Sequence, residues 1–194
     1  EYFLALEEYI QFVKNNHVPV IFYGMNDPMD FAETLPIAQQ ADYIFTHDVD
    51  KLYEYKENCV QAKAIEYVPS PFNPADFNPI GSRDKVKNQV LFAEGWDERY
   101  AKQLNLLFKT VLESTQDLVI FEDSSLNGET VTSYPKRYFS NIINSKITQD
   151  LNRLYKVFDF VISFSSNMVS QSAFSHRISE ISASGAVVLS NYQP

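Results

Sequence analysis

The fold class is decided by the stretch YKVFDFVISFSSNMVSQSAFSHRISEISASGAVVLSNY, which runs from Tyr155 to Tyr192. Its pattern predicts, in chain order, a buried strand at Phe158–Phe164, a serine-rich loop at Ser165–Ser172, a helix at Ala173–Ser184 ended by Gly185, and a strand at Ala186–Ser190. A polar loop that leaves a parallel strand and enters a helix N-terminus is where α/β proteins bind phosphorylated ligands. The stretch therefore predicts an α/β fold and, as the leading hypothesis, a nucleotide or nucleotide-sugar site.

The rest of the chain alternates in the same way. We expect helix Tyr2–Lys14, strand Val18–Tyr23, helix Pro28–Gln40, strand Tyr43–Thr46, helix Asp48–Asn58, strand Ala64–Val68, strand Gln89–Ala93, helix Glu98–Ser114, strand Leu118–Phe121, loop Glu122–Tyr134, and helical stretches Pro135–Asn144 and Thr148–Val157. Strands separated by helices favour parallel βαβ units. In particular, we expect the four strands of the second half to share one parallel sheet.

A proline-rich segment divides the alternation into two runs. The stretch Pro69–Asp84 contains four prolines and shows no helical or strand periodicity, which is typical of a linker. We expect two Rossmann-like parallel-sheet subdomains, residues 1–80 and 81–194, with the linker crossing between two separate sheets. Because the sequence opens at Glu1 within a helical pattern, we expect it to be a piece of a longer chain.

Composition narrows the class of protein. The 194 residues are 45% hydrophobic and carry a net charge of −9, which suits a folded core and disfavours nucleic acid as a partner. The single cysteine, Cys59, excludes an internal disulfide and a thiolate zinc site, and it suits a reducing compartment such as the cytoplasm. We expect it to be a buried small hydrophobe. No apolar run is long enough to span a membrane, and no signal peptide is visible; peripheral membrane association stays open.

Several segments resemble one family. They are FAEGWDERY at 92–100, LVIFEDS at 118–124, YPKRY at 134–138, YK at 155–156 and SNMVSQSAFSHRISEISASGAVVLSNY at 166–192, with FYGMNDPMDF, YIFTHD and YVPSPFNPADFNPI in the first half. Together they resemble the glycosyltransferase-like family that includes bacterial spore-maturation (CgeB-like) proteins. That family belongs to the GT-B glycosyltransferases, which have two Rossmann-like domains.

The resemblance implies a function. It implies a metal-independent, hexosyltransferase-like enzyme without a cofactor, which moves a sugar from a nucleoside-diphosphate donor to an acceptor hydroxyl. UDP is one candidate for the donor nucleotide. Residues 81–194 would bind the donor and residues 1–80 the acceptor, which would be a carbohydrate, polyol or protein. The resemblance also implies a role in bacterial envelope or surface-polymer synthesis.

Glu180 and Arg177 are the leading site residues. In the family, a Glu at the position of Glu180 accepts hydrogen bonds from the donor ribose hydroxyls, and two carboxylate oxygens suit a vicinal diol. Arg177 is expected to neutralise the diphosphate, with Ser172, Ser175 and the helix N–H groups. The alternative is a surface salt bridge between Arg177 and Glu180, or simply exposed charges. Ser172 is equally well a helix cap.

Ser172 also marks a departure from related enzymes. Many of them have a second Glu eight residues before the ribose carboxylate, where it contacts the sugar; this chain has Ser172. The substitution argues against a retaining mechanism of the best-known type.

The loop at 92–100 adds candidates for phosphate contact. Gly95 would let the backbone approach a phosphate without a Cβ clash, and Arg99 is a nearby cation. Tyr134 is expected to flank the base pocket. An ordinary turn, an exposed charge and a helix start are the corresponding simpler interpretations.

A competing site lies in the first half. Asp48 and Asp50 follow a predicted strand, as in metal-dependent, single-domain (GT-A) transferases that hold a divalent cation on the diphosphate. Capping of the next helix is the interpretation we favour. His47 is either an acceptor-side base or a solvated loop histidine, and Asp27 is first a cap, with Pro28 at the first helical position, and second a catalytic candidate. A non-catalytic binding or structural module with the same fold also remains open.

Overall fold

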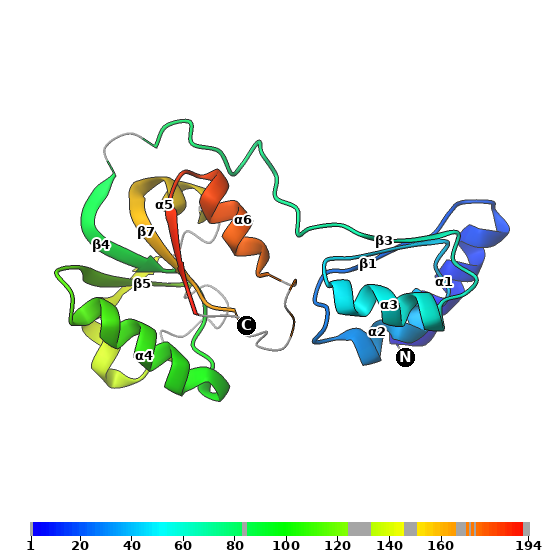
Figure 1. Cartoon of the computed structure of the whole chain (residues 1–194), viewed down its shortest axis with the longest axis horizontal. Helices are drawn as coiled ribbons and strands as arrows, with labels where there is room; N and C mark the ends of the chain where they lie inside the picture. The colour runs from blue at the N-terminus through cyan, green and yellow to red at the C-terminus, as the bar shows by residue number, and fades with distance from the viewer. Residues whose placement is uncertain are drawn as a thin grey trace. The chain divides into compact units, whose positions relative to one another are not determined.

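A computed structural model of the chain describes residues 2–82, 85–123, 133–145, 151–165, 170, 172 and 174–191. Three predicted elements lie partly outside the described residues: positions 124–132 of the loop Glu122–Tyr134, positions 148–150 of the helix Thr148–Val157, and most of the loop Ser165–Ser172. The chain forms two compact units: unit 1 is Glu1–Pro71, Asn167–Phe174 and Gln193–Pro194, and unit 2 is Phe72–Ser166 and Ser175–Tyr192. Figure 1 traces the chain through both.

Unit 1 is built on a three-stranded parallel sheet. Its elements are α1 (Tyr2–Asn15), β1 (Ile21–Gly24), α2 (Phe31–Ala38), β2 (Tyr43–Thr46), α3 (Val49–Asn58) and β3 (Ala64–Tyr67). The strands are ordered β1-β2-β3. The cluster of Phe31, Ile44, Tyr55 and Cys59 is buried between α2, α3 and the sheet, which confirms the expected burial of the cysteine.

Unit 2 is built on a five-stranded parallel sheet. Its elements are β4 (Val86–Phe92), the 3₁₀ helix η1 (Glu98–Tyr100), α4 (Ala101–Leu112), β5 (Asp117–Asp123), the 3₁₀ helix η3 (Lys136–Asn141), β6 (Ile142–Ser145), α5 (Leu151–Val157), β7 (Phe158–Ser163), α6 (His176–Ala183) and β8 (Val187–Ser190). The strand order is β6-β5-β4-β7-β8. The prediction that β4, β5, β7 and β8 share one parallel sheet is confirmed. So is the crossing of the proline-rich segment between two sheets, because it joins β3 to β4.

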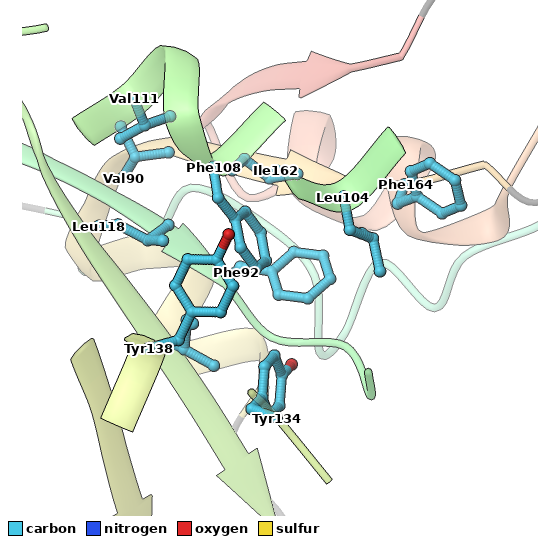
Figure 2. Packing of buried hydrophobic residues seen from close by; sticks show 11 residues of the cluster. Val90, Phe92, Leu104, Phe108, Val111, Leu118, Tyr134, Tyr138, Ile162 and Phe164 are labelled. Atoms are coloured by element: carbon cyan, nitrogen blue, oxygen red, sulfur yellow. The ribbon is translucent and has the colours of Figure 1, made fainter. Parts of the chain in front are cut away.

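Both faces of this sheet are covered, which explains its apolar strands. Successive residues of a strand point to opposite faces, and Phe92 packs with Leu104 and Phe108 of α4, whereas Leu91 packs with Tyr155 of α5 and Ile181 of α6. Figure 2 shows the first of these clusters, in which the Phe92 and Phe108 rings meet edge to face with centroids 4.9 Å apart. The chain therefore has an α/β architecture with two parallel sheets.

Three predicted elements are wrong in detail. The stretch Pro135–Asn144 is not a helix throughout, because the β-branched pair Ile142 and Ile143 pairs along β5 as strand β6. Helix α2 begins at Phe31, well after Pro28, since the chain at 25–30 turns instead of winding into a helix. Helix α6 begins at His176 instead of at 173.

Candidate functional site

The strand order of unit 2 reverses between β4 and β7. The chain runs from β4 to β5 and β6 on one side of the sheet, and then returns to place β7 and β8 on the other side. At such a reversal the loops after the two central strands diverge, and ligands bind in the crevice outside the carboxyl ends of the strands. The residues that follow β4 and β7 are therefore the first place to look for a binding site.

Helix α6 is fixed at both ends by local chemistry. Ser175 caps its start by accepting a hydrogen bond from the Arg177 N–H at 3.3 Å, so the cap is Ser175 and the capping role suggested for Ser172 is wrong. Gly185 ends the helix with φ of +80°, a conformation that favours glycine, as the sequence predicted. Ser184 is fully buried and donates to the Glu180 carbonyl at 2.9 Å.

Arg177 is held in place by two neighbours. Its Nη1 donates a hydrogen bond to the Tyr155 hydroxyl at 3.0 Å, and its Nε lies 3.9 Å from Oε1 of Glu94. Tyr155 is buried on α5, and the Arg177 side chain is only 26% exposed. Arg177 is thus a partly buried cation with fixed orientation, which differs from the solvated surface charge considered as its simpler interpretation.

Glu94 is the site residue that the sequence analysis did not single out. It follows β4 directly after Ala93, and its side chain is 18% exposed. Burial raises the pKa of Glu94 to about 7, although Arg177, the Phe164 N–H and the Ser163 hydroxyl favour the charged form. Ser163 lies near Glu94 without completing a hydrogen bond to it, because both Oε1 of Glu94 and Oγ of Ser163 are buried without a partner. A single acidic residue in a loop has no periodic pattern, so the sequence carried no signal that Glu94 belongs to the site.

Glu180 lies one turn further along α6 than Arg177. Burial raises the pKa of Glu180, and the positive charge of Arg177 opposes that rise. The salt bridge proposed as its simpler role is not formed, since among the ion pairs of the described residues Arg177 joins Glu94 and not Glu180. Within the described part of the chain, the Glu180 carboxylate has no hydrogen bond or ion pair with another side chain.

Gly95 lies in the loop between β4 and η1, and Arg99 lies in η1. A Cβ built at Gly95 would meet nothing within 4 Å, so the backbone there faces open space. Arg99 forms a two-pronged pair with the Asp97 carboxylate, with Nη2 2.6 Å from Oδ2, and its side chain is 75% exposed. The guanidinium of Arg99 is therefore paired with the carboxylate of Asp97.

Tyr134 is buried and contacts the loop that follows β4, so its ring is not exposed to a ligand. It is 4% exposed, its ring packs with Trp96 and Phe92, and its hydroxyl donates to the Glu94 carbonyl. In Figure 2 it lies at the edge of the aromatic cluster. Its contacts fix the backbone that carries Glu94 and Gly95.

The remaining predicted site residues, Ser172 and His47, belong to unit 1. The Ser172 hydroxyl accepts a hydrogen bond from the Val49 N–H at 2.8 Å. His47 is 6% exposed and its Nδ1 has no partner, so its description as a solvated loop histidine is wrong. In unit 2 the structure places Ser175, Arg177 and Glu180 together at α6, and it adds Glu94, the sequence neighbour of Gly95, beside Arg177.

Asp27 is a buried acid and not a helix cap. It is 5% exposed, and its carboxylate accepts hydrogen bonds from the Thr46 hydroxyl at 2.6 Å and the Tyr55 hydroxyl at 3.1 Å. Burial raises the pKa of Asp27 in spite of these donors. Because its carboxylate is turned toward β2 and α3, it cannot reach the N–H groups of α2.

Asp48 and Asp50 take the roles that the capping interpretation predicts. Oδ1 of Asp48 accepts hydrogen bonds from the N–H groups of Asp50 at 2.8 Å and Lys51 at 3.3 Å, and Asp50 is exposed in the first turn of α3. No three His, Cys, Asp or Glu side chains form a metal-binding group among the described residues. The geometry of Asp48 is that of a buried cap.

Comparison with known proteins finds no matching family model and no matching curated protein. Within the described part of the chain, none of the helices combines the length and the apolar character that crossing a bilayer requires.

Proposed function

We propose that the chain is part of a glycosyltransferase of the GT-B type, and that unit 2 binds its nucleoside-diphosphate sugar donor. The observation that carries this proposal is the position of Arg177 and Glu180 on the first turns of α6, which packs beside β7 where the strand order reverses. A cation, a carboxylate and a helix N-terminus at that edge match the diphosphate and the ribose of a nucleotide.

The roles follow from the chemistry of each group. Arg177 donates to the diphosphate together with the N–H groups of the first turn of α6. The two oxygens of Glu180 accept from the ribose 2′ and 3′ hydroxyls. Negative charge develops on the diphosphate as the glycosidic bond breaks, so a fixed Arg177 stabilises the leaving group more strongly in the transition state than in the substrate.

The wider biology comes from the resemblance of the sequence. It supports transfer to a hydroxyl of a carbohydrate, polyol or protein acceptor, in the cytoplasm and in bacterial envelope or surface-polymer synthesis. A metal-independent reaction agrees with the use of Arg177 and helix amides on the diphosphate. The acceptor would be bound through unit 1, where His47 stays a proposed acceptor-side base.

A second candidate, a module that keeps the fold without catalysis, is favoured by one observation. Glu94 places a carboxyl group beside Arg177, where the donor diphosphate is expected, and a carboxylate there repels phosphate. A module of this kind would bind the donor weakly or not at all.

The two candidates differ in ligand binding. Titration calorimetry of the chain with a panel of nucleoside diphosphates should find one base bound in preference to the others, with the melting temperature raised by that ligand. Addition of the matching nucleotide sugar and an acceptor panel then separates transfer from binding alone. Absence of binding by every nucleotide would remove the glycosyltransferase proposal.

A further inference from the structure

Glu94 and Arg177 form an unusual pair. Glu94 Oε1 lies 3.9 Å from Arg177 Nε, beyond hydrogen-bond distance, and accepts no hydrogen bond although it is inaccessible to solvent. A buried carboxylate oxygen without a hydrogen bond is costly, because it loses its water and gains only a partial Coulombic attraction in return. This pair is therefore poorly stabilised when Glu94 is ionised.

Arg177 has hydrogen-bond donors that its neighbours among the described residues do not use. A guanidinium has five N–H donors, and the one hydrogen bond that Arg177 makes through its side chain within the described residues goes to the neutral hydroxyl of Tyr155. An anion that reached Arg177 could form the two-pronged hydrogen bonds that Glu94 does not form. Such an anion would bring a second negative charge close to the Glu94 carboxylate.

We propose that Glu94 is a positioning residue that competes with a bound anion for Arg177, so that the site takes up one proton onto Glu94 when a dianion such as a diphosphate binds. This inference rests on the proposed function for the identity of the anion, but not for the proton linkage itself. The proton comes from solvent and adds to a carboxylate oxygen of Glu94, and no covalent bond of the ligand changes.

The groups around Glu94 favour its protonation when an anion binds to Arg177. The groups that act on its carboxyl are Arg177 of α6, Tyr155 of α5, Tyr134 before η3, and the Ser163 hydroxyl and Phe164 N–H at the end of β7. Arg177 is the one cation among them, and an anion bound to it cancels its effect on Glu94. Because burial already raises the pKa of Glu94 to about 7, a small further rise is enough to protonate it near neutral pH.

The linkage has a defined sign. Above the pKa of Glu94 in the empty site, each rise of one pH unit should weaken anion binding by up to about tenfold, because one proton must be taken up. Below that pKa, Glu94 already carries its proton and the affinity should level off. A nucleotide phosphate also titrates near neutral pH, so the test needs an anion that does not.

Sulfate is a suitable probe because it stays doubly charged over the whole range. Its dissociation constant for the full chain would be measured by NMR titration between about pH 5.5 and 8.5. Wild type should lose affinity with rising pH, whereas Glu94→Gln should show no slope and should bind about tenfold more tightly than wild type at about pH 8. Glu98→Gln is the matched control, because Glu98 is an exposed glutamate at the start of η1, and it should keep the wild-type slope.

An equal pH slope in wild type and Glu94→Gln would overturn the inference, and so would a lack of sulfate binding by both. If Glu94→Gln does not fold, the Glu94 carboxyl of wild type is titrated by carbon-13 NMR with and without sulfate. A pKa that rises on binding supports the inference, and an unchanged pKa overturns it. A sulfate linkage without selectivity among nucleoside diphosphates would contradict the proposed function alone, and selectivity without linkage would contradict this inference alone.

Discussion

Arg177 and Tyr155 join two helices through one hydrogen bond, in which Nη1 of Arg177 donates to the Tyr155 hydroxyl at 3.0 Å. Tyr155 lies on α5 and is 1% exposed, so solvent does not replace this hydrogen bond when it is lost. The bond therefore fixes the guanidinium on α6 relative to the core of unit 2.

Removing this hydroxyl should loosen Arg177. Hydrogen bonds to charged groups contribute about 1.5–3 kcal/mol, so Tyr155→Phe should lower the free energy of unfolding of unit 2 by about 1.5 kcal/mol. Nucleotide affinity should fall with it, because Arg177 must be oriented on binding. Urea denaturation and calorimetry measure both. Tyr53→Phe, at an exposed tyrosine of α3, is the control, and a Tyr155→Phe protein indistinguishable from it would contradict the role given to this bond.

Two glycines give a matched pair of substitutions. A Cβ at Gly24 would lie 2.0 Å from Oδ2 of the buried Asp27, whereas a Cβ at Gly95 would meet nothing within 4 Å. Gly24→Ala should therefore destabilise unit 1 by about 2 kcal/mol through overpacking, and Gly95→Ala should change stability by less than about 0.5 kcal/mol. Amide hydrogen exchange in β1 and β2 follows unit 1 separately from unit 2. Equal exchange rates in the two variants would show that Asp27 does not pack against Gly24.

Glu94 should make stability depend on pH. Its pKa of about 7 in the folded chain lies above the ordinary value of 4.5, so its stabilising contribution is complete below about pH 4.5 and is lost as pH rises through 7. One pKa unit corresponds to about 1.4 kcal/mol, so the difference between wild type and Glu94→Gln should change by on the order of 2–3 kcal/mol over this range, in favour of the variant at high pH. Urea titrations at several pH values measure it. A constant difference would contradict the raised pKa.

Donor binding should not depend on a divalent metal. Because the Asp48 carboxylate is a buried helix cap, chelator should leave nucleotide affinity unchanged, and Asp50→Ala should have an effect within about 0.5 kcal/mol on binding and stability. Calorimetry with and without chelator checks this. A divalent ion that bridges the carboxylates of Asp48 and Asp50 would instead favour the metal-dependent alternative.

The sheet of unit 2 was predictable because its strands are apolar. Runs such as Val90–Phe92 and Phe160–Ser163 are covered on both faces, and burial on both faces leaves a clear trace in the sequence. Strand β6 was missed because it is four residues long and follows a helical turn directly. Short elements whose conformation depends on pairing with a neighbour leave little local signal.

The site was predictable only where a residue type and a helix position agreed. Ser175 and Arg177 were found because they lie near the start of a helix that follows a polar loop, although Ser172 was offered as the cap and the helix was expected to begin at Ala173. Asp27 was misjudged because Asp before Pro is a common helix-start pattern, and its true partners, Thr46 and Tyr55, are distant in sequence. Glu94 was missed for the same reason: Arg177 lies far along the chain, and only the fold brings the two together.

The ribose assignment of Glu180 is the central claim. A comparison that combines one substitution, Glu180→Gln, with a nucleotide that lacks the ribose hydroxyls tests it most directly. Glu180→Gln keeps the shape of the side chain but removes its charge. Since hydrogen bonds to charged groups contribute about 1.5–3 kcal/mol, affinity for the preferred nucleoside diphosphate should fall by roughly 10- to 150-fold. Stability without ligand should barely change, because Glu180 forms no ion pair with a described residue.

The decisive measurement is calorimetry of wild type and Glu180→Gln with this nucleotide and with its 2′,3′-dideoxy form. Glu113→Gln is measured beside them, because Glu113 is exposed and pairs with Lys109 at 3.5 Å. The dideoxy nucleotide should bind wild type poorly and lose little further affinity in Glu180→Gln, because the interaction is already absent. Glu113→Gln should bind both as wild type does. Equal binding of the preferred nucleotide by wild type and Glu180→Gln, or no binding of any nucleotide by wild type, would contradict the account.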